Sequence, residues 1–222
     1  MTGRTVPPGG AGAPGGRRRF LYAAGCAAGA GLLAACGGGG DEPRSDDGPV
    51  VTRSENLEGD LAVAALFVSL ENLLDSVYQE GFDQGDRLGL IPPAVMTLLQ
   101  TAQRQHKEHA AAWNSILTGA GKPGITGVNV NVKSTVSDPG LFRMGDATGF
   151  LALGHELETI TASTYLAGIG AIENNAALKI AASIHIVENQ HISAIEFLLG
   201  RTPAPESFGR TDRGRPTTDS IG

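Results

Sequence analysis

The sequence predicts an all-α protein whose fold is a four-helix bundle made of two helical hairpins joined by a long crossover. Apolar residues recur at helical spacing in four separate segments of the 222-residue chain. An irregular connection, residues 119–145, separates the second segment from the third. A connection this long is unusual in a compact domain unless it crosses the structure, and in a bundle one such crossover joins two antiparallel hairpins end to end.

The first predicted hairpin consists of residues 57–82 and 91–119. The first helix, "LEGDLAVAALFVSLENLLDSVYQEGF", carries apolar residues at helical spacing and is expected to end in the glycine-rich turn that follows. The second opens with Pro92 and Pro93, which a first helical turn tolerates, and is expected to close on Gly119.

The second hairpin has a polar residue at the start of each helix. Asp146 is expected to cap a third helix that continues to Gly170, and Asn174 or Asn175 to cap a fourth helix that ends before Gly200. The intervening crossover shows no helical period but contains a valine-rich piece, "VNVNV". We therefore expect the bundle to span residues 57–200, with a disordered C-terminal tail over residues 201–222.

The N-terminal segment, residues 1–35, has the pattern of a signal peptide, with three arginines before a short stretch of Ala, Gly and Leu. "RRRFL", which starts at Arg17, resembles the twin-arginine motif, whose export route carries folded proteins. "LAAC", which ends at Cys36, resembles a bacterial lipobox, in which the cysteine is lipidated and becomes the new N-terminus. These resemblances imply an exported lipoprotein on the extracytoplasmic side of the cell membrane, with residues 36–56 as a flexible tether.

The cysteine count and the net charge exclude several classes of site and partner. Cys26 lies inside the expected signal peptide, so the mature chain would keep Cys36 alone, which excludes an intrachain disulfide and a thiolate metal site. The signal contains four arginines and no acid, so its removal changes the formal net charge from −6 to −10. Nucleic acid is therefore not expected as a partner, because phosphate binding needs clustered Lys and Arg, whereas metal cations match the charge.

The two hairpins resemble each other in sequence. "LENLLDSVY" overlays "LETITASTY" at a shift of 87 residues, which pairs Glu71 with Glu158. The second helix of each hairpin overlays at a shift of 82 residues, which pairs His106 with Glu188 and His109 with His191. Because the same polar positions align, we predict an internal repeat with twofold pseudosymmetry.

Six of these polar residues are predicted to form a metal site in the bundle core. Residues three apart on a helix share a face, so Glu188 and His191 are expected to point the same way, as are His106 and His109. The pseudosymmetry would bring such pairs together with one glutamate from each of the other two helices, as in di-metal carboxylate proteins of ferritin-like topology. The candidate metal ligands are Glu71, His106, His109, Glu158, Glu188 and His191.

The chain resembles the ferritin-like domain family found in secreted bacterial proteins and desiccation-related proteins. The resemblance covers residues 57 to about 208, including "LGRTPAPESF" after the last helix. It implies a four-helix bundle with a metal centre, and it implies no particular activity. Carried over residue by residue, it gives the ligands Glu71, His109, Glu158, Glu188 and His191.

One position departs from the pattern of that family. Where a Glu-x-x-His pair is expected in the second helix, this chain has His106 and His109. A neutral imidazole stabilises a trivalent ion less than a carboxylate does, so the substitution argues against redox cycling and leaves Zn, Mn(II) or a single Fe(II) as options. The expected cofactor is one or two ions of Fe or Mn, with Zn as the alternative. Glu108, next to His109, is expected to be exposed rather than to replace the missing carboxylate.

Four further residues are expected near the site without binding metal. His155 and His185 each precede a candidate ligand by three residues, and we expect each to hydrogen-bond a ligand carboxylate. Tyr78 and Tyr165 are expected to pack in the core with hydrogen-bonded hydroxyls, and Trp113 is expected in the core as well.

Two functions remain open at the level of the sequence. The first is a lipid-anchored protein with a non-haem metal site, such as an iron or manganese oxidoreductase that handles O₂, peroxide or Fe(II). The second is a non-enzymatic binding or structural module of the cell envelope, on a bundle that has lost its metal. Three buried acids without a cation would have to stay largely protonated, which favours the first. A homo-oligomer is compatible with either.

Overall fold

The computed structural model describes residues 57–88, 91–136 and 146–219, all within one unit, Asp47–Gly222. The expected signal peptide, the lipidation site Cys36 and the tether of residues 36–56 lie outside the described residues. The described part of the chain contains helices and no strand, which confirms the all-α prediction.

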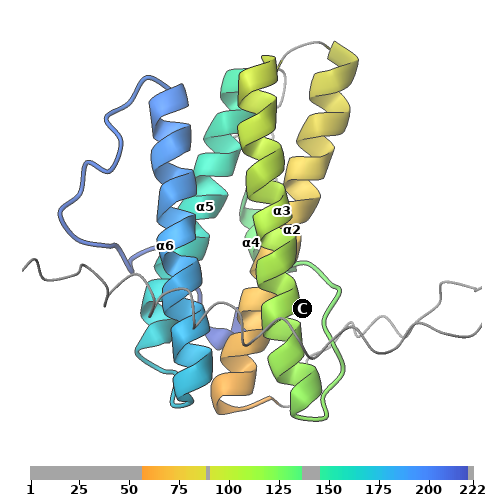
Figure 1. Ribbon diagram of the computed structural model, residues 1–222, viewed down its shortest axis with the longest axis vertical. Helices are drawn as coiled ribbons and strands as arrows, with labels where there is room; N and C mark the ends of the chain where they lie inside the picture. Colours follow the sequence, from red (N-terminus) through yellow and green to blue (C-terminus); the bar gives the residue numbers. More distant parts are fainter. Residues whose placement is uncertain (1–56, 89–90, 137–145, 220–222) are drawn as a thin grey trace, which may run out of the picture. The chain divides into compact units, whose positions relative to one another are not determined.

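Four long helices form the bundle: α2, Gly59–Leu88; α3, Pro93–Gly119; α5, Ala147–Ile169; and α6, Asn175–Leu198. α2 pairs lengthwise with α3 and α5 pairs with α6, so the chain forms the two predicted hairpins (Figure 1). The hairpins meet mainly where α2 packs against α5, whereas α3 and α6 touch along few residues. α3 and α6 therefore flank the least densely packed side of the bundle.

The ends of three helices follow the predicted signals. α3 begins at Pro93 directly after Pro92. The Asp146 side chain accepts a hydrogen bond of 2.7 Å from the backbone N–H of Gly149, and the Asn174 side chain accepts from the first backbone N–H groups of α6. These caps satisfy N–H groups that have no partner within the helix.

α2 is longer than the sequence predicts, because the helix continues past Phe82 through Gly85 to Leu88. A Cβ atom built on Gly81 would overlap the ring of Phe150 in α5. Gly81 therefore allows α2 to lie directly against an aromatic side chain of the other hairpin, and the helix continues to Leu88.

The crossover contains a short helix, α4, Val130–Val136, where the sequence predicts no helical period. Asn129 fixes its start: its backbone N–H donates to the Ser69 carbonyl at 2.9 Å, and its side-chain amide donates to the Ser69 hydroxyl at 3.1 Å. Val132 and Val136 are buried. The end of the valine-rich piece thus packs against the bundle in a helix of about two turns.

The C-terminal segment differs from the disordered tail that the sequence predicts. Residues 201–219 leave α6 and run back along the outside of the bundle to a 3₁₀ turn, η1, Thr217–Asp219 (Figure 1). The backbone N–H of Ala204 donates to Glu196 at 2.9 Å, and that of Arg215 donates to the Thr164 hydroxyl at 3.0 Å. Backbone groups of the segment therefore pair with polar side chains on α5 and α6, which holds it in place.

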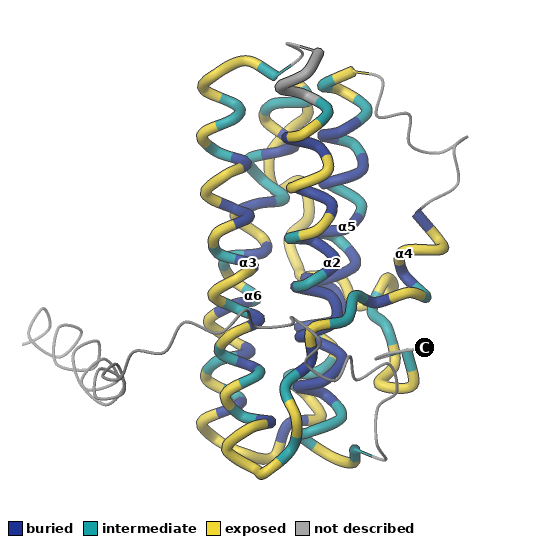
Figure 2. Tube along the Cα trace, turned by 90° about the vertical axis from the view of Figure 1, so that its right-hand side faces the viewer, coloured by how far each residue is buried: buried dark blue, intermediate teal, exposed yellow. Residues whose placement is uncertain are grey.

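The core consists of two apolar clusters with a polar layer between them. One cluster includes Leu73, Tyr78 and Leu157, and the other includes Phe67 and Trp113. Figure 2 shows the buried residues along the inner faces of the helices. Residues Gly59–Gln84 of α2 are long and apolar enough to cross a membrane by length and composition, but 72% of their most apolar window is buried inside the bundle.

Candidate metal centre

The structure brings together all six residues that the sequence predicts as metal ligands. Each of the four long helices supplies one or two of them at the middle of the bundle, between the two apolar clusters. Four are fully buried, and the side chains of His109 and His191 are 11% and 8% exposed. The residues are Glu71 from α2, His106 and His109 from α3, Glu158 from α5, and Glu188 and His191 from α6.

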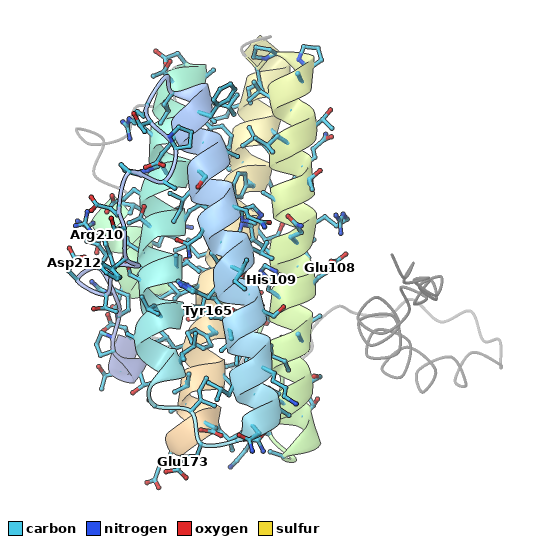
Figure 3. The ribbon with its side chains drawn as sticks, turned by 60° about the vertical axis from the view of Figure 1, so that its left-hand side comes forward. Glu108, His109, Tyr165, Glu173, Arg210 and Asp212 are labelled. Atoms are coloured by element: carbon cyan, nitrogen blue, oxygen red, sulfur yellow. The ribbon has the colours of Figure 1, made fainter. Side chains whose placement is uncertain are left out.

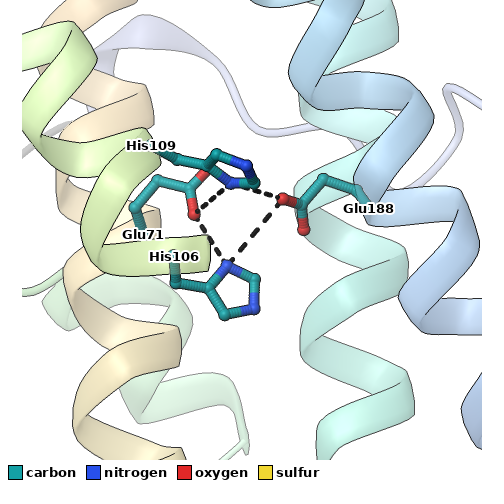
Figure 4. Close-up of side chains that lie close together, drawn as sticks. All are labelled: Glu71, His106, His109 and Glu188. Atoms are coloured by element: carbon teal, nitrogen blue, oxygen red, sulfur yellow. Dashed lines mark hydrogen bonds and ion pairs between the residues drawn. The ribbon is translucent and has the colours of Figure 1, made fainter. Parts of the chain in front are cut away.

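These side chains form two adjoining groups, in each of which the ligand atoms lie within 4.8 Å of one another. We call the group of Glu71, His106, His109 and Glu188 the Glu71 half-site (Figure 4). The group of His106, Glu158, Glu188 and His191 is the Glu158 half-site. His106 and Glu188 belong to both groups.

In the Glu71 half-site, His106 Nδ1 lies 2.8 Å from Glu71 Oε2, within hydrogen-bond distance. His109 Nδ1 lies 3.0 Å from Glu188 Oε1 and 3.4 Å from Glu71 Oε2, but neither pair is aligned as a hydrogen bond. Figure 4 shows these three side chains converging on Glu188 from the opposite hairpin.

In the Glu158 half-site, the other ring nitrogen of His106 is used. His106 Nε2 lies 3.1 Å from Glu158 Oε1. His191 Nδ1 lies 3.4 Å from Glu158 Oε2 and 3.9 Å from Glu188 Oε2. The imidazole of His106 therefore stands between the two half-sites, with one nitrogen toward each.

Two buried tyrosines support the glutamates across the bundle. Tyr78 of α2 donates its hydroxyl to Glu158 Oε1, and Tyr165 of α5 donates to Glu71 Oε1, both at 2.6 Å. Trp113, fully buried, donates from Nε1 to the Tyr165 oxygen at 2.8 Å. Burial and the nearby carboxylates raise the pKa of both tyrosines well above the ordinary value, so both remain proton donors.

The predicted hydrogen bonds of His155 and His185 to ligand carboxylates are wrong. His155 Nε2 lies 3.4 Å from Glu196 Oε1, and the ring of His185 contacts Asn189. Both rings line a cavity of about 230 Å³ beneath the C-terminal segment. Although each lies three residues before a ligand, both rings face the C-terminal segment rather than the centre.

Glu108 is exposed, as expected, and pairs with Arg104 at 2.6 Å. Figure 3 shows its side chain pointing away from the bundle, while His109 and Tyr165 lie inside. The missing carboxylate of α3 is therefore not replaced by its neighbour in sequence.

Gln105 is a site residue that the sequence reasoning missed. Its amide Oε1 lies 2.8 Å from His191 Nε2, across the gap between α3 and α6. When the amide oxygen accepts the Nε2–H, the lone pair of His191 is on Nδ1, the atom that faces Glu158. The position of Gln105 in the sequence, next to the predicted ligand His106, does not indicate that its side chain contacts a residue of another helix.

Among the residues that the structure describes, five buried side-chain atoms have no hydrogen-bond partner. All five belong to the two half-sites: His109 Nδ1, Glu158 Oε2, Glu188 Oε1, Glu188 Oε2 and His191 Nδ1. Leaving a buried polar atom unpaired costs about 1–3 kcal/mol, so native proteins rarely keep such a set without a binding partner. Carboxylate oxygen and imidazole nitrogen are donors that suit Fe, Mn and Zn, so the residues fit a metal ion.

The pKa values of the three glutamates of the centre shift in different directions. Burial alone would raise the pKa of Glu71 and Glu158, but the neighbouring histidines lower both below the ordinary value, that of Glu158 by far. Burial and the charge of Glu71 raise the pKa of Glu188.

The histidines of the centre have raised pKa values despite burial. The charges of Glu158 and Glu188 hold the pKa of His106 well above the ordinary value. Close contact with Glu188 and Glu71 raises the pKa of His109 to about 9, and Glu158 raises that of His191 to about 9. Without metal, the centre is therefore a set of carboxylates held by imidazolium groups.

One family of known domains matches this part of the chain. The family described as a ferritin-like domain matches residues 59–201, a range that contains all six residues of the two half-sites. Comparison with curated proteins and with solved structures found no match.

Proposed function

The chain belongs to the ferritin-like domain family, and on this premise we propose that its bundle binds one or two transition-metal ions at the two half-sites. The observation that carries the proposal is the set of five unpaired buried atoms, which all belong to the two half-sites at the middle of the four helices. Three glutamates and three histidines make up the two half-sites.

The donor set favours iron or manganese, with zinc as the redox-inactive alternative. Bound iron or manganese would supply one-electron chemistry toward O₂, peroxide or Fe(II), so we propose a role in redox chemistry or iron handling. The protein's own contribution is to exclude water with the two apolar clusters and to fix the carboxylates. Tyr78 and Tyr165 each hold one oxygen of a glutamate, so that glutamate cannot rotate freely.

Metal content tests this proposal. The protein is purified without added metal, bound metal per chain is measured, and the metal-free chain is then titrated with Fe(II) under nitrogen, Mn(II) or Zn(II). We expect at least one ion per chain, either retained on purification or taken up on titration. Purified protein that contains none and takes up none of the three ions contradicts the proposal.

A second candidate function has one observation in its favour. The three histidines can carry three positive charges, which balances the three glutamates without any metal. The bundle would then be a non-enzymatic binding or structural module of the cell envelope. The same titration separates the two functions, because the module would take up no ion. Its melting temperature would also be the same with each ion present or absent.

We also propose that the protein is exported through the twin-arginine route and lipidated at Cys36. The support is the sequence alone, "RRRFL" from Arg17 and "LAAC" at Cys36. A route for folded proteins suits a buried centre, since the ions could be loaded before export. Replacing Arg17 and Arg18 by Lys should block export, and normal export of that double variant would point to the general secretory route.

A further inference from the structure

The two half-sites differ in how many of their metal-binding atoms are free of hydrogen bonds. We infer that the first metal ion binds in the Glu158 half-site and that the Glu71 half-site binds a second ion more weakly. This inference rests on the proposed metal-binding function. Three sets of contacts carry it, each of which differs between the two sides of the pseudosymmetric centre.

The first contact concerns the free oxygens of the two glutamates. Glu158 Oε1 takes the hydrogen bonds from both Tyr78 and His106, which leaves Oε2 unpaired. Glu71 has one oxygen bonded to Tyr165 and the other to His106. An ion at Glu158 therefore meets a free oxygen, whereas an ion at Glu71 must displace a hydrogen bond.

The second contact, between Trp113 and Tyr165, strengthens the hold of Tyr165 on Glu71. Because the Tyr165 oxygen accepts the Trp113 indole N–H, its single hydrogen is committed to Glu71. The residue 82 positions after Trp113, its counterpart in the repeat alignment, is Ile195, which has no N–H group on its side chain. Tyr78 on the other side consequently lacks this indole donor.

The third contact positions the histidine of the Glu158 half-site. Gln105 holds Nε2 of His191, so the neutral ring, the form that binds a metal ion, has its lone pair on Nδ1, which lies 3.4 Å from Glu158 Oε2. The counterpart of Gln105, again 82 positions later, is Val187, whose side chain cannot accept a hydrogen bond from His109. A partner on the far nitrogen of a ligating histidine fixes its ring and strengthens metal binding.

The three contacts point to the same half-site. The Glu158 half-site offers three unpaired donors: Glu158 Oε2, His191 Nδ1 and Glu188 Oε2. The Glu71 half-site offers two, His109 Nδ1 and Glu188 Oε1. One resident ion and one exchangeable ion are the expected result.

The pseudosymmetry supplies matched variants for the test. Metal-free protein is titrated with Mn(II) and, separately, Zn(II) by calorimetry, for the parent, His191→Ala and His109→Ala. We expect two unequal binding steps in the parent, loss of the tighter step in His191→Ala, and its retention in His109→Ala. Anomalous scattering from crystals that contain one equivalent of Zn(II) should locate the ion beside Glu158.

Gln105 gives a test that leaves every ligand in place. Gln105→Leu should weaken the tighter step about 10–100-fold, whereas Val187→Ala should leave it unchanged. Gln105→Glu, which keeps an oxygen acceptor, should restore most of the affinity. Circular dichroism checks that each variant is folded, and Gln105 is only partly buried, so its replacement should not prevent folding.

Three results would overturn the inference. They are two equal binding steps in the parent, equal losses in the two histidine variants, or the single zinc ion located beside Glu71. A parent that binds neither ion and also takes up no Fe(II) under nitrogen overturns the proposed function together with this inference, whereas any of the three results overturns the inference alone.

Discussion

At the scale of single residues, His106 determines the charge of the centre. Its two nitrogens lie 2.8 Å and 3.1 Å from the carboxylates of Glu71 and Glu158. A glutamate at this position would place a fourth acid in the same buried space, which only cations could compensate. With histidine, imidazolium and carboxylate groups pair in the metal-free protein, so the proposed function does not require a bound ion to balance the charge of the core.

The variant Glu188→Gln, which lacks the carboxylate shared by the two half-sites, tests whether the protein holds a metal ion or is a bundle that has lost its metal. We expect a chelator to lower the melting temperature of the parent and hardly to move that of Glu188→Gln, because an ion bound only by the folded state stabilises it. The linkage amounts to about 2.7 kcal/mol when the free ion is at 100 times its dissociation constant. Differential scanning calorimetry measures both proteins with and without the chelator. Equal stability of the parent in the two conditions would show that no tightly held ion supports the fold.

The two tyrosines should differ in their contributions to stability. Tyr165→Phe leaves both the Trp113 N–H and Glu71 Oε1 without their partner, so we expect a loss of about 1–3 kcal/mol. Tyr78→Phe removes one bond from Glu158 Oε1, which still faces His106, so the loss should be smaller. Urea unfolding of the metal-free proteins measures the free energy of unfolding. An equal loss in both variants would contradict the pairing that the structure shows.

The metal-free protein should lose stability as the pH rises. Glu188 and Glu71 face His109, and Glu158 and Glu188 face His191, which raises both pKa values to about 9 from an unfolded value of 6.5. A raised histidine pKa stabilises the folded state fully below the unfolded pKa, and this stabilisation is lost as the pH rises through about 9. Melting temperatures of chelated protein between pH 6 and 9.5 should therefore fall, with metal-loaded protein as the control. A flat profile for the chelated protein would disagree with imidazolium at these two positions.

The sequence predicted the six residues of the centre because acids and histidines among apolar residues stand out, and because the halves align. It failed for His155 and His185, since spacing along one helix does not tell which neighbouring element a side chain meets. Gln105 could not be predicted for the same reason, because its partner His191 lies 86 residues away on another helix.

At the scale of the helices, caps and prolines predicted where α3, α5 and α6 begin, because those signals are local. The predicted end of α2 was wrong because glycine does not by itself end a helix: Gly85, in the expected turn, lies inside α2. Within a helix, glycine allows close approach of a neighbour, as Gly81 does toward Phe150. The short helix α4 was not predicted because seven residues are too few to show a helical period.

Gly81→Ala should destabilise the protein by about 1–3 kcal/mol, since the added methyl group must displace the Phe150 ring in a packed core. The matched control is Gly119→Ala at the end of α3, where a Cβ would meet nothing within 4 Å and where alanine should be neutral or slightly stabilising. Thermal and urea unfolding measure both. A neutral Gly81→Ala would mean that α2 and α5 approach less closely than in this structure.

At the scale of the whole molecule, the crossover and the C-terminal segment meet through polar contacts. The Asn129 side chain donates to the carbonyl of Asp219 at 2.7 Å, and it also donates to Ser69 of α2. Arg213 pairs with Glu156 of α5. Such contacts give no periodic pattern in the sequence, which is why order in residues 201–219 could not be predicted from it.

Under the proposed lipidation, one residue would attach the bundle to a membrane: Cys36, in a segment outside the described residues. If Cys36 is lipidated, Cys36→Ala should leave the protein without its lipid, either uncleaved or in the soluble extracytoplasmic fraction. The six residues of the centre lie within residues 59–201, so the variant should bind metal as the parent does when purified. Membrane fractionation, mass spectrometry of the N-terminus and metal content measure these three properties together. A variant that is processed and fractionates like the parent would mean that Cys36 is not the anchor.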